Sequence, residues 1–441
     1  MRSEPAYIDA MDASNEQLLN DQLLQDFQRL SFEYFLNEAN AENGLVADRN
    51  TPTSPASIAA VGLALSSYPV GVERGFMTRA AAIERTLATL RFFWKAPHGP
   101  EPDATGYKGL YYHFLDMKTG RRFWNCELST IDSALLLAGV LVAGAYFDRD
   151  DESELEIRRL AGALYDRADW RWAQNGDGTV AHGWRPETGF LPYRWEGYDE
   201  ALILYVLGLG SSTHPLPPES YAAWLSTYVW KKIYGRELVY AGPLFIHQFS
   251  HVWIDFRGIR DAFMRDHDSD YFQNSREATY LQRDYAIRNP RGFVGYGENC
   301  WGVTASDGPG PIAAAPHRRR YFGYLARGAP FGPDDGTLSP WAAIASLPFA
   351  PEIVLPALRL FHEMDLHDGN PYGFTASFNP TIPAPDGRPC GWVSPDHLGI
   401  NQGPIAPMIE NYRSDFLWRL MRGVPAIVMG LRRAGFSGGW L

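Results

Sequence analysis

The sequence is most tightly constrained by a helical spacing of apolar residues that returns along almost its whole length. Leu128, Ile131, Leu135, Ala138 and Val142 recur every three or four positions, which places them on one face of a helix. Roughly a dozen stretches share this spacing, whereas the alternating pattern of a half-buried strand is scarce. The sequence therefore predicts an all-α protein.

Long loops rich in glycine and tryptophan separate the predicted helices. The expected helices cover residues 16–40, a stretch that begins at the N-cap Ser54, 78–94, 128–145, 152–173, 198–209, 219–234, 269–288, 339–349, 352–364, 402–412 and a last one from Asp415, with weaker signals at 245–255 and 258–263. The loops cover 99–124, 176–195, 289–320 and 369–399. Aromatic residues make up 14% of the chain. Many of them lie in these loops, where rings are typical of a binding face.

The order of helices and loops indicates one domain. No Ser/Gly linker or run of charge divides the 441 residues, and no fixed period of roughly 30–45 residues marks a helical repeat array. The pattern fits an (α/α)6 toroid, in which six inner and six outer helices alternate along the chain and long aromatic-rich loops surround a cleft. We expect a single domain over residues 1–441, with residues 1–15 as a flexible N-terminal extension.

The charge of the chain excludes one class of partner. Lys and Arg number 40 against 51 Asp and Glu, so the formal net charge is −11. Phosphate contacts need clustered cations, so a nucleic-acid partner is not expected. No window of about 18 uninterrupted apolar residues occurs, so no membrane-spanning helix is expected either.

Cysteine spacing and the first residues bear on the compartment. Cys126, Cys300 and Cys390 have no two-residue spacing, which argues against a disulfide framework and a structural zinc. The chain opens without the apolar segment of a secretory signal. Localisation and oligomeric state stay open: the protein is periplasmic or secreted if a signal has been removed, and cytoplasmic otherwise.

Two glutamates stand out because each precedes an apolar helix beside aromatic residues. Glu127 follows Trp124, and Glu196 follows Trp195. The helix between them would return the chain, so both would face the same end of the fold. Neighbouring rings reduce hydration and raise a carboxyl pKa, and glycoside hydrolysis requires one protonated and one ionised carboxyl. Surface acids at helix starts are the competing interpretation.

Asp132 has a structural interpretation. Together with Ser129 it has the form of a capping box, with Asp in place of the usual Glu or Gln. The residue is therefore expected to support the helix entrance.

Other polar and aromatic loop residues are candidates for sugar contacts. Rings offer flat apolar faces that match the C–H face of a pyranose. The candidates for substrate binding are Asp48, Arg49, Trp124, Trp195, Tyr198, Glu298, Trp301, Asp307, Trp392, Asp396 and Gln402. Glu298, Asp307 and Asp396 are also held in reserve as an acid or base. Local turn formation competes with these roles.

No cofactor or metal is expected. His247 and His251 are four residues apart, but the sequence between them lacks the glutamate of the H-E-x-x-H motif. Neither a phosphate-binding G-x-x-x-x-G-K-[ST] nor a strand-linked G-x-G-x-x-G occurs.

At these segments the chain resembles the bacterial putative glucoamylases, which include glycoside hydrolase family 144, the endo-β-1,2-glucanases and related sophorose-releasing enzymes. The matching segments are 45–64 (LVADRNTPTSPASIAAVGLA), 111–138 (YYHFLDMKTGRRFWNCELSTIDSALLLA), 197–215 (GYDEALILYVLGLGSSTHP), 295–309 (GYGENCWGVTASDGP) and 392–413 (WVSPDHLGINQGPIAPMIENYR). The likeness spans nearly the whole chain from about residue 20.

The resemblance implies an (α/α)6 catalytic domain, no metal, and hydrolysis of a β-linked glucan, with β-1,2-glucan as the expected substrate. It also implies inversion at the anomeric carbon and places the essential acids in segments that match Glu127 and Glu196. We expect Glu196 to be the general acid and Glu127 to activate water or orient the base. The family's frequent export signal is missing here.

Three alternatives keep the aromatic loops. One is a glucan hydrolase of different linkage specificity on the same fold. Another is a transglycosylase, whose covalent intermediate needs two carboxyls only about 5 Å apart. The third is a noncatalytic glycan-binding protein, which would tolerate loss of both glutamates.

Overall fold

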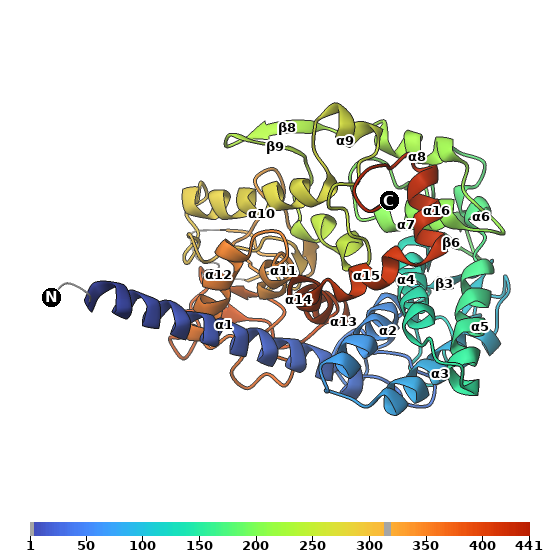
Figure 1. Ribbon diagram of the computed structural model, residues 1–441, viewed down its shortest axis with the longest axis horizontal. Helices are drawn as coiled ribbons and strands as arrows, with labels where there is room; N and C mark the ends of the chain where they lie inside the picture. The colour runs from blue at the N-terminus through green and yellow to red at the C-terminus, as the bar shows by residue number, and fades with distance from the viewer. Residues whose placement is uncertain (1–3, 313–318) are drawn as a thin grey trace.

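A computed structural model describes residues 4–312 and 319–441, with side chains from residue 16 onward. Helices carry the architecture and the strands are short, which confirms the all-α prediction (Figure 1). The α-helices are α1 (Glu4–Asn37), α2 (Ile58–Glu73), α3 (Arg79–Lys95), α4 (Thr130–Tyr146), α5 (Glu152–Asp166), α6 (Trp170–Gln174), α7 (Leu202–Gly210), α8 (Pro218–Leu225), α9 (Ala262–Asp266), α10 (Tyr271–Arg288), α11 (Pro340–Ala345), α12 (Pro351–Glu363), α13 (Gly399–Gln402), α14 (Ile405–Ser414), α15 (Phe416–Arg422) and α16 (Pro425–Arg433). Two 3₁₀ turns, η1 (Leu244–His247) and η2 (Phe249–Val252), occupy the weak signal at 245–255.

Helices of two kinds build the core. Helices α2 and α4 pack against each other and are buried on almost every side. Their contact needs glycine, because a Cβ on Gly139 would lie 2.0 Å from the Gly62 carbonyl oxygen. By contrast α3 and α5, which pack against each other, bury one face only. In Figure 1 these two lie outside α2 and α4.

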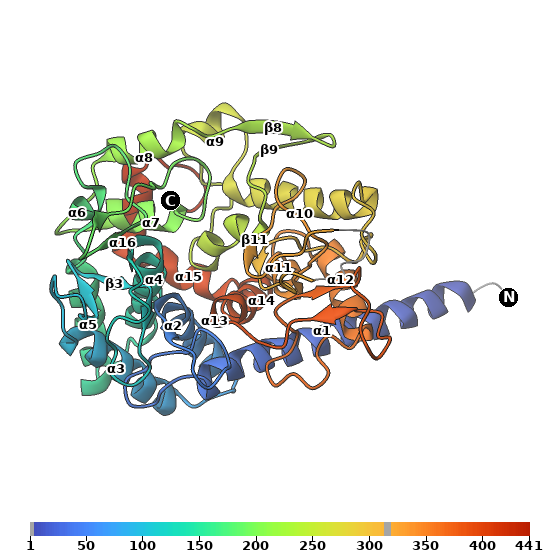
Figure 2. The same cartoon turned by 180° about the vertical axis from the view of Figure 1, so that it is seen from behind.

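The N-terminal helix lies across the C-terminal part of the chain. Helix α1 contacts α12, α13 and α14 as well as α2, and Figure 2 shows it running past α12. Because α1 begins at Glu4, most of residues 1–15, expected as an extension, continue this helix.

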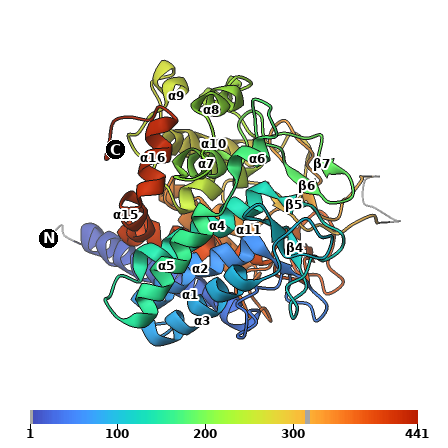
Figure 3. The same cartoon turned by 90° about the vertical axis from the view of Figure 1, so that its right-hand side faces the viewer.

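Short strands gather at one end of α4. Figure 3 shows β4 (Phe114–Leu115), β5 (Leu128–Ser129), β6 (Gly183–Arg185) and β7 (Gly189–Phe190) on the same side of the molecule. An antiparallel sheet runs in the order β2 (Gly106–Tyr107), β3 (Leu110–Tyr112), β5, β6, β7. Strand β5 leads directly into α4, so the sheet fixes the entrance of this helix.

The sequence prediction is wrong about the end of one helix and about the cap of another. The helix expected over 219–234 ends as α8 at Leu225, and a hairpin of β8 (Trp230–Ile233) and β9 (Arg236–Val239) follows. Tyr234 and Gly235 join these strands, both with positive φ (52° and 87°), as a two-residue hairpin turn requires. Helix α2 is capped by Ser57 and not by Ser54, because β1 (Ala56–Ser57) first pairs with β4.

The remaining strands are β10 (Ala305–Ser306), β11 (Leu325–Ala326), β12 (Phe378–Asn379) and β13 (Trp392–Val393). They form the pairs β10–β11 and β12–β13 within the long loops. The buried ion pair of Arg327 with Asp335, at 2.7 and 2.9 Å, secures the end of β11, and Arg327 also donates to the Ser306 carbonyl of β10 at 2.8 Å. Arg327 therefore ties β10 and β11 together.

Candidate active site

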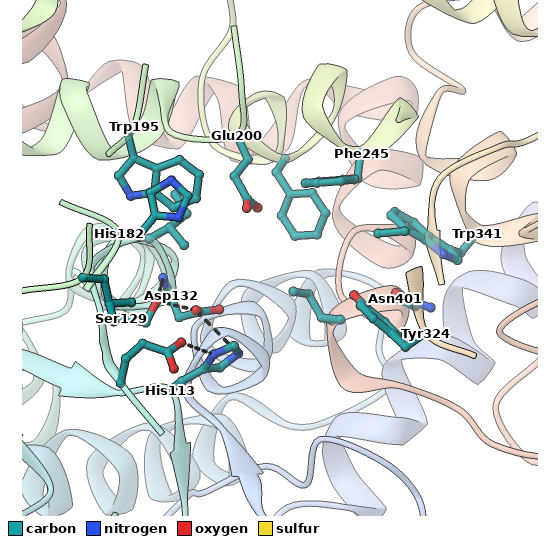
Figure 4. A pocket seen from close by; sticks show the side chains of 16 residues that line it. His113, Ser129, Asp132, His182, Trp195, Glu200, Phe245, Tyr324, Trp341 and Asn401 are labelled. Atoms are coloured by element: carbon teal, nitrogen blue, oxygen red, sulfur yellow. Dashed lines mark hydrogen bonds and ion pairs between the residues drawn. The ribbon is translucent and has the colours of Figure 1, made fainter. Parts of the chain in front are cut away.

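A cavity of about 270 Å³ opens where the sheet, the start of α7 and the C-terminal loops meet. It is close to the lower limit of roughly 300 Å³ for ligand pockets. Its lining residues are His113, Glu127, Ser129, Ile131, Asp132, His182, Leu191, Trp195, Glu200, Phe245, Phe249, Ala305, Tyr324, Trp341, Ile400 and Asn401. In Figure 4, Glu200 points into the cavity from the side opposite His113.

Glu127 reaches the cavity because β5 is held between two other strands. Its carbonyl accepts a hydrogen bond from the His113 N–H at 3.0 Å, and its Oε1 lies 2.9 Å from His113 Nδ1. Arg185 of β6 lies 3.9 Å from Oε2. Burial raises the pKa of Glu127, but the hydrogen bond and charge of His113 and the charge of Arg185 outweigh it, so the pKa is lower than usual. Glu127 is therefore ionised at neutral pH.

Asp132 lies at the first turn of α4. The predicted N-cap is confirmed: Ser129 Oγ accepts from the Asp132 N–H at 3.2 Å. The same hydroxyl donates to Asp132 Oδ2 at 2.5 Å, and this oxygen lies 3.6 Å from His113 Nε2. Asp132 therefore has two roles: it belongs to the cap of α4, and its carboxyl group forms part of the cavity wall.

Glu200 is the carboxyl that enters the cavity from the other side. It precedes α7, which begins at Leu202 and not at residue 198 as predicted. Asp199 holds this loop, because its Oδ1 accepts from the Ala201 N–H at 2.9 Å and from Trp224 Nε1 at 3.1 Å. Burial, together with the charges of Asp132 and Asp199, raises the pKa of Glu200 to about 8. Glu200 is therefore protonated at neutral pH.

Glu196 is not brought together with Glu127. Its side chain is exposed, its Oε1 accepts a hydrogen bond from Thr179 at 3.2 Å, and it does not line the cavity. Between Glu196 and Glu200 the chain turns at Gly197, which has a φ of 83° and whose N–H donates to the Trp224 carbonyl at 3.0 Å. This turn directs residues 196 and 200 to different surroundings.

Trp195 does line the cavity. Its ring stacks on His182 with centroids 3.8 Å apart, and its Nε1 donates to Thr130 Oγ1 at 3.0 Å. Figure 4 shows the two rings together on one wall. The pair presents a rigid aromatic surface beside the carboxyls.

Four of the predicted polar residues form one cluster. Arg49 donates to both oxygens of Asp307 at 2.5 and 3.1 Å, and it lies 3.6 Å from Asp396 Oδ2 and 3.5 Å from Asp48 Oδ2. Burial raises the pKa of Asp48, on which the charges of His113 and Asp132 also act. The cluster therefore stands close to the cavity, although none of its members is in the lining.

The other predicted residues have different positions. Trp124 is 64% exposed, and its ring meets Phe114 edge-on at 5.3 Å. Glu298 is exposed and pairs with Arg283, away from the cavity lining. Trp301 is fully buried. Tyr198 packs against Tyr228, His247 and Tyr271. Trp392 pairs with Asn379 between strands β12 and β13. Gln402 is buried, and its Nε2 lies 3.1 Å from His397 Nδ1.

The sequence analysis does not identify several residues of the cavity. Among them are His113, Glu200 and Tyr324, although the first two lie in the segments 111–138 and 197–215. The sequence predicts a helix from residue 198, which would include Glu200. In the structure α7 begins only at Leu202, so Glu200 lies in the loop before the helix. No signal in the sequence marks Tyr324.

His247 and His251 have protein partners. His247 Nδ1 lies 3.3 Å from Asn274 Nδ2, and His251 Nε2 lies 2.9 Å from Ser275 Oγ. Within residues 4–312 and 319–441, no group of three or more His, Cys, Asp or Glu is arranged to hold a metal ion. No helix in this part of the chain is long and apolar enough to cross a membrane.

Known proteins share this fold and are similar to this chain in sequence. A crystal structure of a putative glucoamylase from Bacteroides uniformis is 33% identical with a TM-score of 0.85, and the match covers 96% of this chain and 98% of that one. An endo-beta-1,2-glucanase from Chitinophaga pinensis, solved with sophorotriose and glucose, is 27% identical with a TM-score of 0.83 and coverage of 96% and 99%.

A curated relative is the exo beta-1,2-glucooligosaccharide sophorohydrolase of Parabacteroides distasonis, which is 29% identical. The match covers 96% of this chain, but the chain spans only 59% of the length of that relative. The family model for "Putative glucoamylase" matches residues 192–425. The chain therefore belongs to the putative glucoamylase family, which confirms the resemblance found in its sequence.

Proposed function

We propose that this protein is a glycoside hydrolase that cleaves β-linked glucan, with β-1,2-glucan as substrate. One observation carries the proposal: a carboxyl with a raised pKa, Glu200, and one with a lowered pKa, Glu127, line the same cavity. Environments that push two carboxyl pKa values apart are typical of an acid and base pair. The proposed substrate is supported by two relatives, a beta-1,2-glucooligosaccharide sophorohydrolase and an endo-beta-1,2-glucanase.

In this proposal Glu200 is the general acid, in place of Glu196. Its proton passes to the glycosidic oxygen as the bond from that oxygen to the anomeric carbon breaks. A water adds its oxygen to the anomeric carbon and gives a proton to Glu127. Glu127 then loses this proton to solvent and Glu200 takes one up, so the charges return to their starting state.

The same proposal assigns substrate contacts to residues around the cavity. Trp195 offers its ring to a sugar face, and the cluster of Asp48, Arg49, Asp307 and Asp396 offers hydroxyl partners. Trp124 offers a platform for a glucose unit outside the cavity, because its side chain is largely exposed to water.

We further propose that the helices form an (α/α)6 toroid and that the chain is one catalytic domain. Supporting this, α2 and α4 are buried on almost every side, whereas α3 and α5 are buried on one face, which is how inner and outer helices differ. The neighbouring loops and sheet then surround the cleft.

The test is product analysis on a panel of purified glucans. Release of short oligosaccharides from β-1,2-glucan, and not from amylose or β-1,3-glucan, is expected. Proton NMR of the first-formed anomer identifies the stereochemistry, and inversion is expected. Turnover of another glucan alone would contradict the linkage, and a retained anomer would contradict the single displacement. Binding without hydrolysis of any glucan would favour a noncatalytic protein.

A further inference from the structure

His113 is held rigidly between the elements that build the cavity. It lies between β3 and β4, its N–H donates to the Glu127 carbonyl at 3.0 Å, and its carbonyl accepts from the Ile58 N–H at 3.3 Å. Its ring stacks on Phe114 with centroids 4.0 Å apart and planes 11° apart. The imidazole therefore has a fixed position and a fixed orientation.

Each ring nitrogen of His113 faces a different carboxylate. Nδ1 lies 2.9 Å from Glu127 Oε1, and Nε2 lies 3.6 Å from Asp132 Oδ2 (Figure 4). A neutral imidazole carries one N–H and serves one acceptor, whereas an imidazolium donates from both nitrogens. The hydrogen-bond distance at Nδ1 and the ion-pair distance at Nε2 therefore suit the charged ring.

The surrounding charges favour the same state. Burial lowers the pKa of His113, but Asp132, Glu127 and Asp48 outweigh burial and raise the pKa to about 9. Two arginines pair with the acids around His113: Arg185 lies 3.9 Å from Glu127, and Arg49 lies 3.5 Å from Asp48.

The fourth acid near His113 is Glu200, and its pKa is raised despite the charge of His113. The charge of His113 acts to lower the pKa of Glu200, but burial and the charges of Asp132 and Asp199 prevail. The His113 imidazolium thus stands beside Glu127, Asp132 and Asp48, and Glu200 is the protonated carboxyl.

We propose that His113 is a positioning residue that is protonated in the resting enzyme and, by lying between Glu127 and Asp132, keeps Glu127 ionised and leaves Glu200 as the carboxyl that holds the proton. The role in turnover rests on the proposed hydrolysis of glucan. The charge of His113 is a property of the protein alone.

The charge is measured first, on the wild-type protein without substrate. Labelling the histidines with ¹⁵N distinguishes an imidazolium from a neutral ring. Among the histidines that the structure describes, His113 has a raised pKa, while His98, His182, His247, His251, His367 and His397 have lowered values. An imidazolium signal from His113 is therefore expected at ~pH 8, where ordinary histidines are neutral. Loss of that signal in His113→Gln assigns it.

The kinetic arm uses His113→Gln and His113→Asn. The acidic limb of the kcat/KM profile reports the base in the free enzyme. Without the imidazolium this limb moves to higher pH by about one unit or more. We expect kcat to fall roughly tenfold or more, while KM changes little, because the base is displaced and the sugar contacts remain. The matched control is His214→Gln, which removes a histidine 4.0 Å from Asp169 at a partly exposed position outside the cavity lining.

Two results overturn the inference: a His113 ring that titrates near its ordinary value of about 6.5, or an acidic limb that stays in place in both folded variants. If neither variant folds, the wild-type spectrum alone decides, since the absence of an imidazolium at ~pH 8 contradicts the charge. Failure of the wild-type protein to cleave any glucan removes the proposed function. A neutral His113 in an active enzyme removes this inference alone.

Discussion

The replacement Glu200→Gln is expected to lower activity strongly and to stabilise the protein. Burial and neighbouring acids raise the pKa of Glu200 from 4.5 to about 8. The folded protein therefore binds a proton at neutral pH that the unfolded chain releases. A carboxyl with a raised pKa contributes its full stability below about pH 4.5, and this contribution is lost as the pH rises toward about 8.

The magnitude follows from the interval between the two pKa values. At about pH 7 the unfolded carboxyl lies roughly 2.5 units above its pKa, and each unit is worth 1.36 kcal/mol, which gives an upper value of about 3 kcal/mol. Glutamine mimics the protonated acid and does not titrate. We therefore expect Glu200→Gln to raise the free energy of unfolding by about 1–3 kcal/mol at neutral pH and to leave it unchanged at about pH 4.

Thermal unfolding of both proteins at the two pH values measures this difference, and initial rates on β-1,2-glucan measure activity. Loss of a general acid lowers kcat/KM by about 10²–10⁴. The control is Glu196→Gln, the same change at an exposed site four residues earlier, for which activity should not change. Equal stability of Glu200→Gln and wild type at both pH values would refute the raised pKa, and full activity would refute the role as acid.

Replacing Glu127 by Gln should lower kcat by about 10²–10⁴ with a small change in KM, because the ionised base is lost; steady-state kinetics check this, and undiminished kcat would remove Glu127 from the mechanism. Trp124→Ala should raise KM by about two- to tenfold for oligosaccharides long enough to leave the cavity and should not affect the shortest one cleaved, as expected for an exposed ring platform; a uniform change across chain lengths would argue against a platform. Gly139→Ala should cost about 1–3 kcal/mol or more, because the new Cβ would lie 2.0 Å from the Gly62 carbonyl oxygen. Gly162→Ala, with no atom within 4 Å of its new Cβ, is the control for that melt, and equal melting temperatures for both variants would contradict the close α2–α4 contact.

Periodicity alone located most of the helices. Apolar spacing determines which face of a helix is buried, and this property is local, so α4 and its cap Ser129 are readable from the residues themselves. The strands are not, because β1 and β5 are only two residues long and exist through their partners β4, β3 and β6. Hence the sequence predicts the start of α4 but places the cap of α2 at the wrong serine.

The candidate site divides in the same way. Composition and motif place acids and rings at the loop ends, and Glu127, Trp195 and Arg49 are found there. Arg49 and Asp307, however, are 258 residues apart in the chain, and the sequence gives no sign that they meet.

The choice between Glu196 and Glu200 shows the limit most clearly. Both precede an apolar helix, and both stand near aromatic residues, so local patterns favour them equally. The turn at Gly197 and two hydrogen bonds decide which carboxyl loses its water: Trp224 Nε1 donates to Asp199, and the Gly197 N–H donates to the Trp224 carbonyl. Desolvation depends on everything packed around a group, and only the folded chain supplies those neighbours.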